Sequence, residues 1–70
     1  LVDLTPNLDF QDALILAMKA EKNAFKLYNS LAEQADDPAI RDMLFALAQE
    51  EAKHKLRFET EYDELVFTEN

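Results

Sequence analysis

The sequence contains no cysteine, no glycine and only two prolines. Without cysteine the chain cannot form disulfides, iron–sulfur clusters held by thiolates, or zinc sites with thiolate ligands. Hydrophobic residues make up 49% of the chain, but there is no long uncharged run, so no transmembrane segment is predicted. No stretch resembles a signal peptide, and we therefore expect a cytoplasmic protein.

Basic residues are also scarce. The chain has 7 Lys and Arg and 15 Asp and Glu, which gives a net charge of −8. This balance argues against nucleic acid and anionic membrane surfaces as partners, since both are themselves negatively charged. Many of the carboxylates are expected to solvate the outer faces. A cation is the natural small partner of those that remain.

The start of the chain predicts an extended lead-in followed by a long helix. Residues 1–8 form the lead-in, because Pro6 biases the residue before it away from helix. Asp9 is the predicted N-cap of a helix that runs from Phe10 to about Ala35 with a sustained 3.6-residue period.

A turn and a second helix follow. Asp37 can cap the second helix and Pro38 suits its first position. That helix is expected to run to about Leu65, with a tail over residues 67–70. The 70 residues thus predict one small all-α domain, a long antiparallel helical hairpin over residues 9–66.

Acidic side chains interrupt the apolar stripe of each helix. In the first helix, Glu21 lies within a stripe at helical spacing that comprises Phe10, Leu14, Met18, Phe25, Tyr28 and Ala32. In the second, Glu51 and His54 lie within a stripe that comprises Ile40, Met43, Leu44, Leu47, Phe58, Tyr62 and Leu65. Ionised groups are almost never fully buried unless they are paired or bound to metal. Two helices that each direct acid at the core therefore predict a metal site.

Both helices also carry more apolar surface than one helix–helix contact can cover. The additional strips comprise Ala13, Leu16, Ala20, Ala24, Leu27 and Leu31 in the first helix, and Phe45, Ala48, Ala52 and Leu56 in the second. Each large side chain gains roughly 1.5–3 kcal/mol on burial, so a further helical partner is expected. The simplest partner is a second copy, which gives a homodimeric four-helix bundle.

The spacing of the polar residues indicates the kind of metal. Glu51 and His54 are three residues apart and lie on one helical face, where both can reach one ion. Carboxylates with one imidazole suit iron or manganese and, less specifically, zinc. One Glu on one helix with Glu-x-x-His on the next is half of the di-iron carboxylate pattern. Two hairpins supply the full set of four Glu and two His for two iron ions.

Other interpretations of these residues stay open. Glu-x-x-His also occurs on solvated helices, and His54 could be a boundary residue paired with Glu50 or Glu51. Tyr28 fits a core position as well as a functional one. Two further functions are compatible with the pattern: iron binding or storage without turnover, and a metal-free helical dimerisation module.

The combination of motifs resembles the rubrerythrin branch of the ferritin-like superfamily. Glu21 and Tyr28 form Glu-x6-Tyr, and after an acidic turn comes Leu47-Ala48-Gln49-Glu50-Glu51-Ala52-Lys53-His54. The resemblance covers about residues 9–66 and corresponds to the second helix pair of such a domain. It implies a non-haem di-iron centre with Glu21, Glu51 and His54 as metal ligands, and Tyr28 beside the metals. The implied chemistry is oxidation of Fe(II) by oxygen or reduction of peroxide.

The chain departs from that family in three respects. It has no first helix pair, so the site is expected to form between chains or within a longer parent. Rubrerythrins usually carry another carboxylate one turn after the first Glu, where this chain has Ala24. There is no Cys-x-x-Cys module and hence no built-in electron donor. The resemblance thus supports the di-iron fold more strongly than peroxide reduction.

Overall fold

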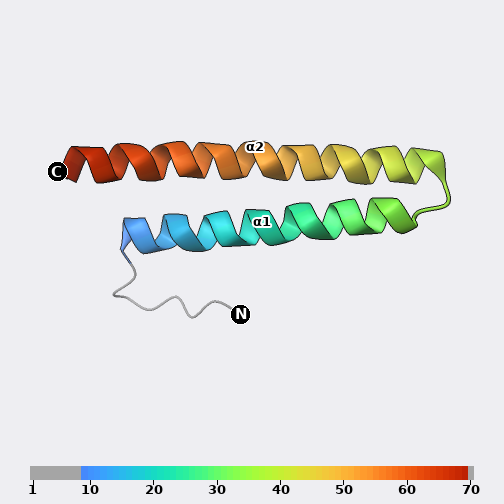
Figure 1. The fold of residues 1–70 in the computed structure, drawn as a ribbon, viewed down its shortest axis with the longest axis horizontal. Helices are drawn as coiled ribbons and strands as arrows, with labels where there is room; N and C mark the ends of the chain where they lie inside the picture. The colour runs from blue at the N-terminus through green and yellow to red at the C-terminus, as the bar shows by residue number, and fades with distance from the viewer. Residues whose placement is uncertain (1–8, 70) are drawn as a thin grey trace.

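The computed structural model describes residues 9–69, which form two long helices, α1 (Phe10–Gln34) and α2 (Pro38–Glu69). The helices run antiparallel and side by side and are joined by a short turn (Figure 1). The predicted all-α helical hairpin is therefore confirmed. No helix within residues 9–69 is long and apolar enough to cross a membrane.

Both predicted helix starts are present. The carboxylate of Asp9 accepts a hydrogen bond of 2.8 Å from the backbone N–H of Asp12, which satisfies one of the free donors at the start of α1. The carboxylate of Asp37 accepts one of 2.8 Å from the N–H of Ala39. Pro38 occupies the first position of α2, where its missing N–H costs nothing.

Polar contacts at each end of the hairpin fix how the two helices align. At the turn, the guanidinium of Arg41 donates to the carbonyl oxygen of Ala35 at 3.1 Å, just after the last turn of α1. At the open end, the side-chain amide of Gln11 donates to the hydroxyl of Tyr62 at 3.2 Å. The two contacts lie about six helical turns apart, at opposite ends of the seam.

The second helix is longer than the sequence predicted. It continues to Glu69 instead of ending near Leu65, so residues 67–69 of the predicted tail are helical. No glycine or proline follows Pro38, and the backbone therefore meets no helix breaker there. The predicted lead-in at residues 1–8 and the last residue of the tail lie outside the described residues.

The seam between the helices is narrow. Among the described residues only Leu14, Ala32 and Ala48 are buried. Ala48 was predicted in the surplus strip, whereas Met43 and Leu47, predicted in the core stripe, are 54% and 39% exposed. The apolar arc of α2 is wider than one partner helix can cover, and α1 covers the part that includes Ala48.

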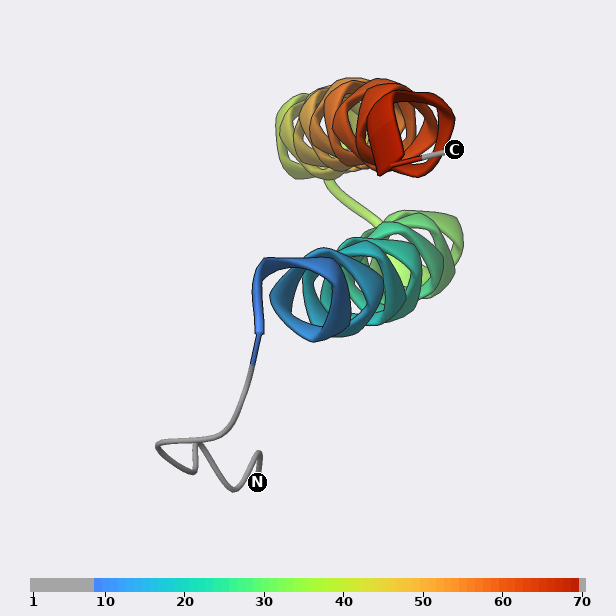
Figure 2. The ribbon, with the colours of Figure 1, turned by 90° about the vertical axis from the view of Figure 1, so that its left-hand side faces the viewer.

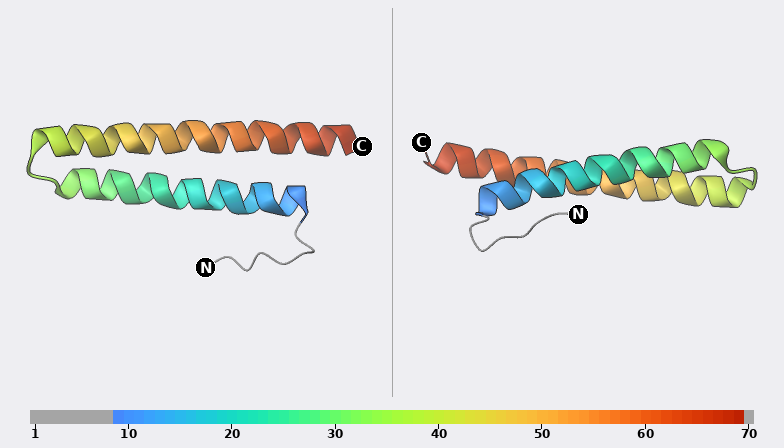
Figure 3. Two further views of the ribbon diagram at one scale, coloured as in Figure 1. Left: turned by 180° about the vertical axis from the view of Figure 1, so that it is seen from behind. Right: turned by 90° about the horizontal axis from the view of Figure 1, so that it is seen from below.

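Both broad faces of the hairpin are left open. Figure 2 views the two helices nearly end-on, and Figure 3 shows them from behind and below; together they form a single layer. One buried leucine and two buried alanines are a small core, because each fully buried large side chain contributes only roughly 1.5–3 kcal/mol. A domain of this size needs further burial to be stable.

Candidate metal centre

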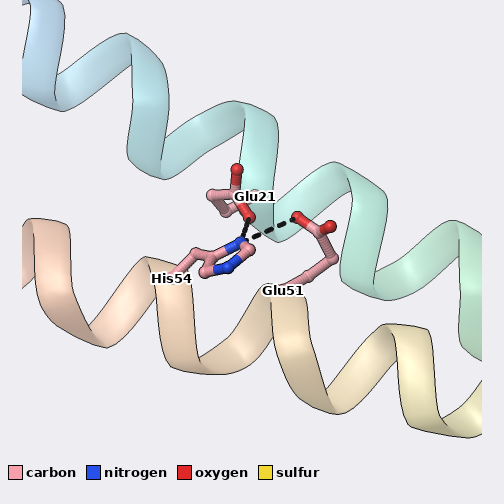
Figure 4. Close-up of side chains that lie close together, drawn as sticks. All are labelled: Glu21, Glu51 and His54. Atoms are coloured by element: carbon pink, nitrogen blue, oxygen red, sulfur yellow. Dashed lines mark ion pairs between the residues drawn. The ribbon is translucent and has the colours of Figure 1, made fainter.

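The three polar residues singled out in the sequence meet at one level of the hairpin. Glu21 projects from the middle of α1, and Glu51 and His54 project from successive turns of α2 opposite it (Figure 4). Glu21 lies far from Glu51 and His54 in the sequence, and the antiparallel alignment of the two helices brings them together. One ligand atom from each of the three lies within 4.8 Å of the other two.

The imidazole of His54 is the centre of the group. Its Nδ1 lies 3.3 Å from Oε2 of Glu21 and 3.9 Å from Oε2 of Glu51. Figure 4 shows both carboxylates directed towards this one nitrogen. The acids are well covered, with about 20% of each side chain exposed, whereas 54% of His54 is exposed. The site is thus closed by the seam on one side and open on the side of His54.

The two acids of the site lie close enough to influence each other electrostatically. The pKa of Glu51 is raised above its ordinary value of 4.5, mainly because protonated Glu51 can share a hydrogen bond with Glu21. Desolvation and the negative charge of Glu21 raise this pKa further, while His54 opposes the shift. Within the described residues, Oε2 of Glu21 is buried and accepts no hydrogen bond; Nδ1 of His54, 3.3 Å away, forms an ion pair with it only when the imidazole is protonated. A buried carboxylate oxygen without a donor is costly.

These features fit a bound transition-metal ion. Bonds from such an ion to imidazole nitrogen and carboxylate oxygen are about 2.0–2.2 Å, as for zinc, which places neighbouring ligand atoms roughly 3–4 Å apart. The separations from Nδ1 of His54 fall in this range. A cation would also supply the partner that Oε2 of Glu21 lacks and favour the ionised form of Glu51. The donor set of two carboxylates and one imidazole suits iron or manganese.

Neighbouring polar residues are engaged elsewhere. Glu50 accepts a hydrogen bond from the ammonium group of Lys53 at 3.2 Å on the exposed surface, so His54 has Glu21 and Glu51 as its acidic neighbours. Tyr28 is half-buried on α1, seven residues or about two turns beyond Glu21. It does not belong to the group of three, and a role beside the metals stays a prediction.

Two properties of this site were not visible in the sequence pattern. The unpaired oxygen of Glu21 and the raised pKa of Glu51 both depend on how closely α1 approaches α2. The pattern gave only the direction of each residue around its own helix. An acid near the middle of an apolar stripe was the single available signal.

We call the side of the hairpin on which His54 is exposed the His54 flank. A shallow hollow of about 310 Å³ beside the imidazole is lined by Phe10, Leu14, His54, Arg57, Phe58 and Glu61. Met43 and Leu47 share this side of α2, because they precede His54 by eleven and seven residues, close to whole numbers of turns. His54 of the candidate site and exposed apolar side chains therefore share one surface.

Comparison with known proteins gives one match. The model of the Rubrerythrin family matches residues 12–70, most of the chain and both helices. Neither a curated protein nor a solved structure matches.

Proposed function

The chain belongs to the rubrerythrin family, and from this premise we propose that it is a non-haem di-iron protein whose site is completed between two hairpins. The observation that carries the proposal is the convergence of Glu21, Glu51 and His54 on one point, with a buried oxygen of Glu21 unpartnered. Three ligands are too few for an iron pair. A second hairpin doubles them to the four Glu and two His of the di-iron carboxylate pattern.

The second hairpin is proposed to dock on the His54 flank. Phe10, Ala17, Ala24 and Leu31 recur on α1 at seven-residue spacing, the period with which packed helices meet. Phe10 and Leu31 are 59% and 41% exposed in the single hairpin. On α2, Met43 and Leu47 continue this surface. Covering it with a second copy related by a two-fold axis buries the apolar side chains and closes the site around His54.

Each of the three side chains has a distinct part in this proposal. Glu21 and Glu51 would hold the iron ions through their carboxylate oxygens, and His54 would hold them through a ring nitrogen. Because the pKa of Glu51 is raised, protons compete with the metal for this carboxylate at higher pH than they do at an ordinary glutamate. When bound, the iron pair supplies two-electron redox chemistry, namely oxidation of Fe(II) by oxygen or peroxide. The apolar surface around the site limits access of water.

Loading the protein with Fe(II) under anaerobic conditions and then adding peroxide tests this function. We expect one peroxide to be consumed for every two Fe(II), because two one-electron oxidations balance one two-electron reduction. The measurement is residual Fe(II) and peroxide after mixing, with free Fe(II) at the same concentration as the control for uncatalysed oxidation.

The other outcomes separate the alternatives. Iron that binds but reacts no faster than the free ion would indicate storage without turnover. Preference for manganese over Fe(II) in competition would replace the iron assignment, because manganese normally binds more weakly than Fe(II). Zinc binds most such sites more tightly than Fe(II), so a preference for zinc does not discriminate. Failure to bind any of the three ions would leave a metal-free dimerisation module and overturn the proposal.

A further inference from the structure

The hairpin has a second hollow, on the side away from His54. It is a groove of about 420 Å³ between the helices, lined by Lys22, Phe25, Lys26, Ala52, Lys55 and Glu59. We call it the lysine groove. Lys22, Ala52 and Lys55 directly follow Glu21, Glu51 and His54 in the chain, yet successive helical residues point about 100° apart. The groove therefore opens on the flank opposite to the one proposed for the second hairpin.

The charge of the lysine groove is opposite to that of the protein. Three of the seven basic residues of a chain with net charge −8 converge on it. Its one acid, Glu59, is engaged by the ammonium group of Lys55 at 3.3 Å. Within residues 9–69, neither Lys22 nor Lys26 has an ion pair or a hydrogen bond. Two ammonium groups are thus free at the rim of this groove.

The floor of the groove is apolar, since the side chains of Phe25 and Ala52 contribute to it together with the methylene stems of the lysines. Its volume falls in the range of about 300–1,000 Å³ found for small-molecule sites. Lysine ammonium groups act as point charges that bind anions without demanding a planar, bidentate partner. The combination selects a molecule with an apolar body and an anionic head.

We propose that the lysine groove binds an organic carboxylate with an aliphatic or aromatic body, with its carboxylate between Lys22 and Lys26 and its apolar part along Phe25 and Ala52. Charge and apolar surface act together in this site. The net negative charge of the chain repels anions from most of its surface. The hollow on the His54 flank competes less well, because its one guanidinium, that of Arg57, shares the lining with the carboxylate of Glu61. The inference does not depend on a metal at Glu21, Glu51 and His54.

Three probes separate the need for an anionic head from the need for an apolar body. Decanoate has both, acetate lacks the apolar body, and decanol lacks the charge. Each is titrated into metal-free protein in the presence of a chelator, and backbone amide shifts are followed by NMR. We expect decanoate to bind at least about tenfold more tightly than either other probe, with the largest shifts at Lys22, Phe25 and Lys55. Binding of acetate or decanol as tight as decanoate would overturn the proposal, as would shifts centred on Leu47.

A pair of variants tests the role of the lysines. The double substitution Lys22→Gln with Lys26→Gln removes both free ammonium groups from exposed positions, so folding is expected to be unaffected. Decanoate binding should weaken by about tenfold or more. Lys53→Gln is the matched control, because Lys53 is paired with Glu50 and does not line the groove; its affinity should stay within about twofold. Equal effects of the two changes would contradict the proposed site.

Discussion

Replacing Glu51 with glutamine is expected to remove metal uptake while leaving the metal-free protein more stable at neutral pH. The amide keeps the shape of the side chain but cannot supply the negative charge that a carboxylate would offer to an iron ion. Loss even of a side chain that only supports a metal ligand costs about 10–100-fold in affinity, so loss of a ligand should exceed 100-fold. The measurement is iron per chain after anaerobic loading, together with thermal unfolding in the presence of a chelator.

The expected gain in stability follows from the pKa of Glu51. A pKa above 4.5 in the folded protein means that the folded state holds the proton more tightly than the unfolded state. The charged form therefore destabilises the fold at pH values above the raised pKa, and this cost disappears as pH falls through it. Glutamine removes the cost, so the melting temperature of the metal-free variant should exceed that of the parent at pH 7 but not at pH 4.

Glu50→Gln is the control for this prediction. Glu50 is the adjacent acid in the chain but pairs with Lys53 on the exposed surface. Its replacement should leave iron loading unchanged and should raise the melting temperature less than Glu51→Gln does, because the charge of Glu50 is the smallest of the causes that raise the pKa of Glu51. Full iron loading of the Glu51→Gln protein would show that Glu51 is not a ligand. A melting temperature below that of the parent protein at pH 7 would show that the charge of Glu51 does not destabilise the fold.

Replacing Leu47 with glutamate is expected to dissociate the assembly. Leu47 lies on the His54 flank, and each copy contributes one such side chain to the proposed interface. Full burial of a leucine is worth roughly 1.5–3 kcal/mol, and the 39% of each Leu47 that is still exposed accounts for about 0.6–1.2 kcal/mol of this. Two lost leucines therefore weaken association by roughly 10–50-fold before the cost of burying two carboxylates is added. Sedimentation of metal-free protein over a range of concentrations measures the change.

Leu56→Glu provides a demanding control. Leu56 is 64% exposed in the single hairpin against 39% for Leu47, so exposure alone predicts the larger effect at Leu56. It follows His54 by two residues and therefore points to the opposite side of α2. We expect this protein to remain dimeric and to load iron. Dissociation by Leu56→Glu, or a dimer that survives Leu47→Glu, would place the interface on another face.

The parts of the structure that were predicted from sequence depend on local signals. Asp9 and Asp37 cap their own helices through contacts within three residues, which the sequence displays directly. The convergence of Glu21 with Glu51 and His54 required one more step, the assumption that two apolar stripes face each other. That assumption holds because the turn between the helices is short, so that α2 runs back along α1.

The parts that were not predicted depend on how the helices approach each other. The apolar arc of α2 is wide enough for more than one partner, so its period could not indicate that Ala48 is buried while Met43 is exposed. The lysine groove joins Lys22 and Lys26 of α1 to Lys55 of α2, and only the alignment of the hairpin brings them together. Periodicity within one helix carries no information about such contacts.

The central claim is that two hairpins hold two iron ions through Glu21, Glu51 and His54. Native mass spectrometry of protein loaded anaerobically with Fe(II) tests it most directly, because it reports subunits and ions in the same species. The account predicts a dimer that carries two iron ions, one per chain. A dimer without iron after repeated loading would contradict it and leave the hairpin as a dimerisation module.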